Sequence, residues 1–301
     1  MRIIFIATGE IALPAFRFLL ENGLRPLALV TQPDKPAGRH HTLTPPAIKL
    51  AALEARVPVF QPVTIGDALS ELQALAPELI VVMAYGQILR QNILTLASKA
   101  IVNLHASILP KYRGAACIQA AIDAGDTETG ITAIHVVREL DAGDIITIKT
   151  LPIAPDETGG SLHDRLALLA PAVLAEVIET IATGAASRTP QDDHLSSYIP
   201  KLERDAGRLD WTQDAATLER RIRAYEPWPG TFTTDATGAK RLKIFPPTLV
   251  IEQSLPTGEF SQGSDGQLVI GCGSGALQIE WLQPEGNRRM KAADYLRGLK
   301  R

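Results

Sequence analysis

The sequence predicts an α/β fold in which a doubly wound sheet is followed by a small β-barrel. The first observation is that short apolar runs rich in β-branched residues alternate with helical periods in the N-terminal part of the chain. The second is a polar stretch that begins near residue 187, and the third is a C-terminal part of short strands separated by Gly, Pro and Asp. These features predict a Rossmann-like N-terminal domain and an OB-like C-terminal barrel.

Buried parallel strands are predicted where the apolar runs occur, and helices where the apolar residues recur every three or four positions. Two further strands, "ITAIHVV" and "DIITIKTLPI", flank a loop at residues 138–143, and a long helix follows with Leu162, Leu166, Leu169, Val173 and Val177 on one face. The first strands are expected at Ile3–Ala7, Pro26–Thr31, Leu79–Ala84 and Ile101–Leu104, and the helices between them at Leu13–Asn22, Ala47–Ala55 and Asp67–Leu75.

The composition divides the chain into two domains and a linker. Residues 1–186 form the predicted α/β domain, residues 187–206 the linker, which is rich in Ser, Thr, Pro, Asp and Gln, and residues 207–301 the β-barrel domain. A helix is expected at Ala215–Arg223, before strands in "TFTT", "RLKIF", "QLVIGC" and "ALQIEWL". The barrel domain carries 13 Lys and Arg against 11 Asp and Glu, so it is mildly basic in a chain with a formal net charge of −3.

Composition also limits the class of protein. A pI near 6.1 gives no global signature of nucleic-acid binding, so any such binding must depend on local patches. Cys117 and Cys272 lie far apart with no CxxC spacing, which argues against a disulfide framework and a thiolate zinc site. The N-terminal apolar run is too short for a signal peptide, and we find no apolar run of about 18 residues. We therefore expect a cytoplasmic protein without a membrane anchor.

Polar side chains follow the fourth predicted strand. Asn103 and His105 are two positions apart in an extended stretch, so both side chains can face the crevice at the end of the sheet. An amide can donate to a developing oxyanion and an imidazole can donate or shuttle a proton, a pair that suits acyl transfer. The loop "ELDAGD" offers Asp141 or Asp144 to orient the imidazole. The competing interpretation is that His105 only caps the strand end.

The stretch "NLHASILPKYRGAACIQAAIDAGDTETGITAIHVVRELDAGDII" resembles the catalytic core of the folate-dependent formyltransferases, with their Asn-x-His, Ser-Leu-Leu-Pro and Leu-Asp-x-Gly elements in order. Three further segments resemble the methionyl-tRNA formyltransferases in that superfamily. They are "TQPDKPAGR" at residues 31–39, "AYGQIL" at 84–89, and "RLDW" with "IRAYEPWPG" before the barrel. The resemblance extends from Ile3 to about Arg297.

The resemblance implies an activity and its catalytic residues. A formyl group would pass from 10-formyltetrahydrofolate to the α-amine of methionine on initiator tRNA. Asn103, His105 and Asp141 match the family's catalytic set. Asn103 and protonated His105 would donate to the tetrahedral oxyanion, and Asp141 would favour the imidazolium and relay a proton to the leaving folate nitrogen. The implied reaction requires neither a metal nor a covalent intermediate.

The resemblance also implies binding residues for both substrates. Lys35 and Arg39, in the loop that resembles the family's acceptor-end loop, are the predicted tRNA contacts; the alternative is a solvated surface turn. The implied folate site consists of Ser107, Ile108, Leu109 and Pro110, with Ile88, Leu89 and the stretch from Val137 to Leu140 as walls, although the apolar members of this set could equally be core residues.

The sequence departs from the family pattern at several places. "ATGE" replaces the usual Gly-Thr-Pro after the first strand, so contacts near Thr8 and Gly9 are open, and Ala106 replaces a Gly. Cys117 stands where Pro is common and is expected to be a small core residue. His40 and His41 replace lysines after Arg39, so phosphate attraction there should strengthen as the pH falls.

Three other functions are compatible with parts of the sequence. A sugar-nucleotide formyltransferase would share the catalytic set but would not need the acceptor-end loop. A metal-dependent hydrolase would use His105, His135, His163 and Asp144, which lack a compact ligand spacing. A non-catalytic RNA-binding protein would leave the Asn, His and Asp set unexplained.

Overall fold

The chain contacts divide the protein into two compact units. The structure, a computed structural model, describes residues 1–37, 42–235, 237–263 and 266–299. Unit 1 comprises Met1–Gly114, Thr129–Leu151 and His163–Tyr198. Unit 2 comprises Ala115–Glu128, Pro152–Leu162 and Ile199–Arg301.

Unit 1 is built on a seven-stranded sheet with the order β10-β9-β7-β6-β1-β2-β5. Strands β7, β6, β1, β2 and β5 are parallel to one another, and β9 runs antiparallel to β7. All five residues of β1 and of β6 are buried, as the unbroken apolar runs predict for strands covered on both faces. The predicted Rossmann-like sheet is confirmed. The strands are β1 (Ile3–Ala7), β2 (Ala28–Val30), β5 (Val59–Phe60), β6 (Leu79–Met83), β7 (Ala100–His105), β9 (Glu128–His135) and β10 (Ile145–Pro152).

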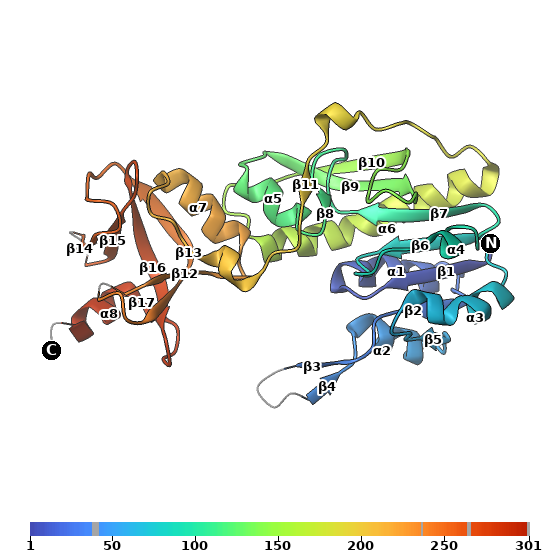
Figure 1. Cartoon of the computed structure of the whole chain (residues 1–301), viewed down its shortest axis with the longest axis horizontal. Helices are drawn as coiled ribbons and strands as arrows, with labels where there is room; N and C mark the ends of the chain where they lie inside the picture. The colour runs from blue at the N-terminus through green and yellow to red at the C-terminus, as the bar shows by residue number, and fades with distance from the viewer. Residues whose placement is uncertain (38–41, 236, 264–265, 300–301) are drawn as a thin grey trace. The chain divides into compact units, whose positions relative to one another are not determined.

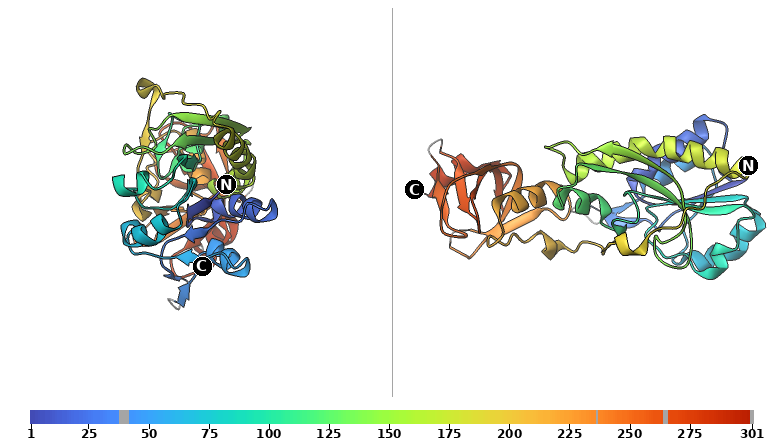
Figure 2. Two further views of the ribbon diagram at one scale, coloured as in Figure 1. Left: turned by 90° about the vertical axis from the view of Figure 1, so that its right-hand side faces the viewer. Right: turned by 90° about the horizontal axis from the view of Figure 1, so that it is seen from above.

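Helices cover both faces of this sheet, with α6 and α3 on opposite sides in the right-hand view of Figure 2. Within the described part of the chain, α6 alone is long and apolar enough to span a membrane by length and composition. However, Leu162, Leu166, Val173 and Val177 of α6 are fully buried, which is the pattern of an amphipathic helix that covers a core. The helices are α1 (Leu13–Glu21), α2 (Ala47–Glu54), α3 (Leu69–Ala74), α4 (Gln91–Leu94) and α6 (Gly159–Thr183).

Several short elements were not predicted. A hairpin of β3 (Lys35–Ala37) and β4 (Thr42–Thr44) extends away from the sheet in Figure 1. The helix expected from Asp67 begins earlier, as a 3-10 turn at Ile65–Ala68, because Thr64 and Asp67 form a capping box. The predicted linker contains 3-10 turns at Asp193–Leu195 and Arg204–Gly207 and the strand β11 (Tyr198–Ile199), which pairs with β8 (Arg113–Gly114).

Unit 2 contains an antiparallel sheet whose strands alternate between core and solvent. Leu242 and Ile244 of β13 are buried among Leu268, Ile279 and Leu282, whereas Arg241 and Lys243 point to the opposite, exposed face. Helix α7 is capped by Asp214, which accepts from the Thr217 amide, and it packs on β13. The small C-terminal β domain that the sequence predicts is confirmed, and its strands are antiparallel. Its elements are α5 (Cys117–Asp123), α7 (Ala215–Ala224), β12 (Thr231–Thr234), β13 (Arg241–Ile251), β14 (Phe260–Gln262), β15 (Leu268–Gly271), β16 (Ala276–Pro284), β17 (Met290–Lys291) and α8 (Ala292–Leu299).

Candidate active site

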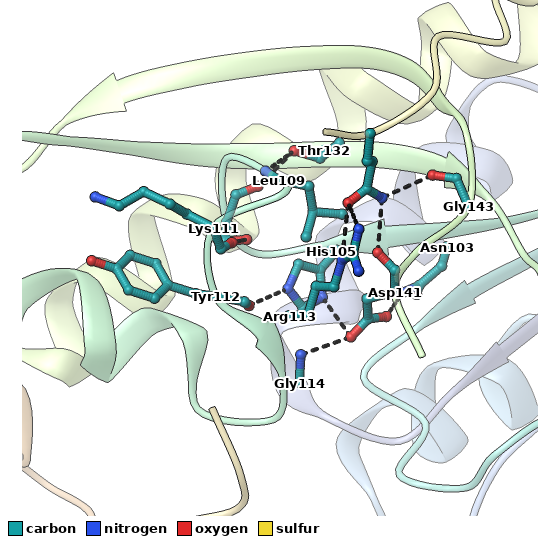
Figure 3. Close-up of polar contacts among 12 residues, drawn as sticks. Asn103, His105, Leu109, Lys111, Tyr112, Arg113, Gly114, Thr132, Asp141 and Gly143 are labelled. Atoms are coloured by element: carbon teal, nitrogen blue, oxygen red, sulfur yellow. Dashed lines mark hydrogen bonds and ion pairs between the residues drawn. The ribbon is translucent and has the colours of Figure 1, made fainter. Parts of the chain in front are cut away.

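Asn103 and His105 of β7 both face the carboxylate of Asp141 (Figure 3). The Asn103 amide donates from Nδ2 to Asp141 Oδ1 over 3.2 Å. His105 Nδ1 lies 3.6 Å from Asp141 Oδ2. The side chains of His105 and Asp141 are only 7% and 11% exposed, so the imidazole and carboxylate interact with little screening by water. The structure therefore brings the three predicted catalytic residues together.

The second ring nitrogen of His105 faces a backbone carbonyl. Nε2 lies 2.9 Å from the carbonyl oxygen of Tyr112. Since a carbonyl oxygen only accepts, Nε2 must carry the proton and donate it. Nδ1 then faces a carboxylate, so both ring nitrogens face acceptor oxygens, an arrangement that suits the imidazolium. Tyr112 was not predicted as a site residue, because it contributes only its backbone.

Asp141 is held in an unusual loop conformation. Its φ is +52°, in the left-handed region, and the Gly114 amide donates to Asp141 Oδ2 over 2.9 Å. Gly143 passes so close to the sheet that an added Cβ would lie 1.7 Å from the His135 carbonyl oxygen, so only Gly fits there. Asp144, the other carboxylate that the sequence offered, lies 3.7 Å from Arg188 instead.

The segment after β7 is fixed by Thr132, a residue that the sequence did not indicate. Thr132 Oγ1 donates to the Ser107 carbonyl over 2.7 Å and accepts from the Leu109 amide. Ser107 is fully buried and its hydroxyl donates to the Lys111 carbonyl. Leu109 is buried, whereas Ile108 and Pro110 are half-buried.

The predicted walls of the folate site differ in exposure. Ile88 is 71% exposed, and Val137 and Leu140 are exposed to 39% and 45%. These three are large apolar side chains that the fold leaves available to an apolar ligand. Leu89 instead belongs to the core cluster around Tyr85 and Ile93. Leu89 is therefore a core residue, which the sequence left as the alternative to a folate contact.

Of the two predicted tRNA contacts, only Lys35 lies within the described residues. Lys35 is exposed in β3, while Arg39, with the neighbouring His40 and His41, lies outside the described residues. Asp34, at the base of the hairpin, binds Lys49 Nζ over 2.7 Å and accepts from the Gln61 amide. The hydrogen bond from Lys49, then that from Gln61, lowers the pKa of Asp34.

Three of the positions that depart from the family pattern, Thr8, Gly9 and Cys117, have defined surroundings. Thr8 Oγ1 donates to the Tyr85 carbonyl and accepts from the Gln32 amide. The Gly9 amide donates to the Ala84 carbonyl over 3.1 Å. Cys117 is buried, as expected of a core residue.

The histidines of the metal-hydrolase interpretation have different partners. His135 Nε2 is 3.1 Å from the Ser187 carbonyl oxygen, and His163 pairs with Asp164. Burial, and then the charge of Arg188, lowers the pKa of His135. Across the described ranges, no group of three or more His, Cys, Asp or Glu is arranged to hold a metal ion.

In unit 2, basic and aromatic side chains share the exposed face of the sheet. The Arg289 guanidinium lies over the rings of Phe245 and Trp281, and Lys291 also lies over Trp281. Arg241 lies over Phe232, which pairs across the strands with Lys243. We call this set, Phe232, Arg241, Lys243, Phe245, Trp281, Arg289 and Lys291, the basic-aromatic face. By contrast, Arg221 pairs with Asp123 and Arg223 with Glu219, so these two α7 side chains make internal contacts.

Two family profiles match the chain. One, described as "Formyl transferase", covers residues 1–178, and the other, described as "Formyl transferase, C-terminal domain", covers residues 201–300. A methionyl-tRNA formyltransferase from Akkermansia muciniphila is 51% identical over 306 residues, covering 99% of this chain and 96% of the relative.

Solved structures share the fold. An N-formyltransferase from Helicobacter canadensis, in complex with folinic acid and dTDP-3-aminofucose, superposes with a TM-score of 0.70 at 16% identity over 96% of this chain and 100% of its own. HypX from Aquifex aeolicus in complex with tetrahydrofolic acid gives a TM-score of 0.65 at 20% identity, over 98% of this chain and 47% of HypX.

Proposed function

Because the chain belongs to the formyltransferase family and aligns along nearly its whole length with a methionyl-tRNA formyltransferase, we propose that 10-formyltetrahydrofolate is its formyl donor and that Asn103, His105 and Asp141 carry out the transfer. The enzyme formylates the methionyl group of initiator tRNA for translation initiation. The observation that carries the catalytic assignment is the convergence of Asn103 and His105 on one carboxylate, that of Asp141, which is only 11% exposed.

Asn103 supplies a hydrogen-bond donor to the reaction. One Nδ2 proton is donated to Asp141, and this fixes the plane of the amide. The second proton of the same nitrogen is not used by that hydrogen bond and can be donated to the oxyanion that forms when the α-amine attacks the formyl carbon. Removing one such donor typically costs on the order of 100- to 1000-fold in rate.

We assign to His105 and Asp141 the proton transfer from the attacking amine to the folate nitrogen. The new C–N bond leaves the attacking nitrogen with a proton that must be lost, and the C–N bond to the folate nitrogen breaks as that nitrogen gains one. The Asp141 carboxylate, which faces His105 Nδ1 at 3.6 Å, would accept the proton that the attacking nitrogen loses and relay it to the folate nitrogen, while its charge favours the imidazolium of His105. The Tyr112 carbonyl keeps the ring oriented through Nε2, and Nδ1 faces Asp141. Because both ring nitrogens already face acceptors, the hydrogen bond to the oxyanion that the resemblance implied for His105 is assigned here to Asn103 alone.

The folate site is proposed on the exposed apolar side chains. Ile88, Val137 and Leu140 offer apolar surface for a flat pterin ring, and the chain from Ser107 to Pro110 offers backbone groups held in place by Thr132. The chemistry fits a folate, because a flat aromatic ligand with polar edges needs both kinds of group. The donor supplies the activated formyl group when it is bound.

For the tRNA, we propose contacts at Lys35 and Arg39 and on the basic-aromatic face of unit 2. Cationic side chains that cover aromatic rings suit a polyanionic backbone with exposed bases. We assign residues 1–186 to catalysis, 187–206 to the linker and 207–301 to tRNA binding, and we place the enzyme in the cytoplasm, where its tRNA substrate is used.

The test is single-turnover formylation of methionyl initiator tRNA with 10-formyltetrahydrofolate, with the amino sugar nucleotide dTDP-3-aminofucose as the competing acceptor. We expect transfer to the tRNA only, and loss of the chemical step in His105→Ala with folate binding retained. Transfer to the sugar nucleotide alone would replace the proposed acceptor. The Helicobacter canadensis likeness, at 16% identity, shows a shared fold and does not identify the acceptor.

A further inference from the structure

Gln191 lies in the stretch predicted as a linker, yet its side chain reaches the loop that carries Asp141. Its Nε2 donates to two carbonyl oxygens, those of Asp141 and Gly143, each over 2.8 Å. Its Oε1 accepts from Arg113, from Nε over 3.1 Å and from Nη2 over 2.9 Å. The amide thus joins the Asp141 loop to the segment that follows β7.

These contacts fix the orientation of the amide. A Gln side chain has two N–H donors and two lone pairs, and all four are used here. Turning the amide over would set N–H groups against the guanidinium of Arg113 and an oxygen against two carbonyls. Only one arrangement satisfies all four partners, so Gln191 holds its neighbours at defined positions.

The contacts of Gln191 close a ring around the Asp141 carboxylate. Gln191 binds the carbonyl of Asp141 on one side and Arg113 on the other. Arg113 is followed by Gly114, whose amide donates to Asp141 Oδ2. The loop that carries the carboxylate and the segment that binds it are therefore held together through one side chain. Gly143, packed against the His135 carbonyl, fixes the far end of the loop.

We propose that Gln191 is a positioning residue that sets the Asp141 carboxylate against Asn103 and His105. This inference rests on the proposed function, in which Asp141 acts on the reacting groups through those two side chains. The four hydrogen bonds of the Gln191 side chain go to Arg113, Asp141 and Gly143, so Gln191 acts on Asn103 and His105 through Asp141. If Gln191 only anchored the linker to unit 1, its replacement would leave the rate of the chemical step unchanged.

The kinetic test compares wild type with Gln191→Met, which keeps the length of the side chain without its hydrogen bonds. A carboxylate displaced by about 1 Å costs on the order of 100-fold, so we expect the single-turnover rate constant to fall by about 10- to 100-fold. The KM values for tRNA and folate should stay within about twofold, since no substrate contact is removed. Gln191→Glu keeps the acceptor for Arg113 but loses both N–H donors. Its single-turnover rate constant should fall at least as far as that of Gln191→Met.

Asp193→Asn is the matched control. Asp193 also binds Arg113, over 2.7 Å, but its side chain is 80% exposed, and its replacement leaves the hydrogen bonds from Gln191 to the Asp141 loop in place. Its rate constant should stay within about twofold of wild type. A fall in Asp193→Asn equal to that in Gln191→Met, or a raised tRNA KM with an unchanged rate constant, would overturn the proposal.

A second readout does not depend on activity. The Gly114 amide donates to Asp141 Oδ2, so its hydrogen exchange, measured by NMR, reports whether the carboxylate is in place. We expect faster exchange of this amide in Gln191→Met than in Asp193→Asn, at matched thermal stability. If the Gly114 amide exchanges at the same rate in Gln191→Met as in wild type, the positioning role is contradicted, even if wild type proves inactive on tRNA. If the amide exchanges faster in Gln191→Met but wild type does not formylate tRNA, only the proposed function is contradicted. If Gln191→Met does not fold, both measurements are made on Gln191→Glu.

Discussion

Among single residues of the candidate site, Asp141 is constrained through both its side chain and its backbone. Its carboxylate receives N–H groups from Asn103 and Gly114 and faces His105, while its backbone adopts a φ of +52°. A left-handed backbone at a residue other than Gly costs about 1 to 3 kcal/mol and persists only where the surroundings impose it. The loop is therefore built to place this carboxylate.

Replacing Asp141 by Asn should keep the shape of the side chain but remove the negative charge that faces His105. An amide carries no charge, and it would turn an N–H group toward one of the donors that now bind the carboxylate. We expect the single-turnover formylation rate to fall on the order of 100-fold or more. Asp144→Asn, in the same loop but directed at Arg188, is the control and should stay within about twofold. Equal effects of the two changes would contradict the assignment.

His135 predicts a pH dependence of stability. Burial lowers its pKa in the folded protein, so the unfolded chain binds a proton more readily. The free energy of unfolding should therefore decrease as the pH falls below about 6.5, by at most about 1.4 kcal/mol per pH unit from this group. Urea unfolding at several pH values would show that the free energy of unfolding depends less steeply on pH in His135→Gln than in wild type. Parallel slopes would exclude His135 as the source.

Among the elements, the hairpin of β3 and β4 depends on side chains at its base. Asp34 binds Lys49 of α2 and Gln61, which follows β5, and Gln61 also donates to the Gln32 carbonyl. These bonds join the base of the hairpin to the helix α2 and to the residue that follows the strand β5. The orientation of the predicted tRNA contact Lys35 therefore depends on residues outside the hairpin.

Asp34→Asn should weaken tRNA use without slowing the chemistry. The loss of the charge removes the ion pair with Lys49, so the hairpin is less well ordered before tRNA binds. We expect the KM for methionyl-tRNA to rise about 2- to 10-fold with the rate at saturating tRNA unchanged. Glu78→Gln, which removes the ion pair with Lys99, is the matched control. A fall in the saturated rate would place Asp34 in the catalytic step.

The sequence predicted elements whose patterns are local and missed those that depend on distant partners. β1 and β6 are continuous apolar runs and were placed within one residue, whereas β3 and β4 show no apolar alternation. In the site, the residues alone left Asp141 and Asp144 as alternatives, because both lie in one loop. Gln191 gave no signal, since its partners are mostly backbone carbonyls 48 and 50 positions away.

For the molecule as a whole, the overall charge gives little indication of the proposed partner. A net charge of −3 would not attract tRNA, yet unit 2 gathers four cationic side chains on its basic-aromatic face. Glu226 lies near Arg289 and Lys243, and its burial raises its pKa, while these two cations act in the opposite direction. The local arrangement of cationic side chains on this face is therefore a better indication of tRNA binding than the net charge of the chain.

The basic-aromatic face predicts a measurable change in the salt dependence of tRNA binding. Each cationic contact to a phosphate releases counterions and contributes about 0.7 to 0.9 to the slope of log Kd against log salt concentration. The triple variant Lys243→Gln, Arg289→Gln, Lys291→Gln should therefore lower this slope by about two to three and weaken binding at low salt. Arg297→Gln removes a charge from the exposed pair with Asp294 on α8 and should leave the slope unchanged. If the triple variant kept the wild-type slope, the tRNA backbone would contact another part of the molecule, and the cations of this face would serve only to cover Phe245 and Trp281.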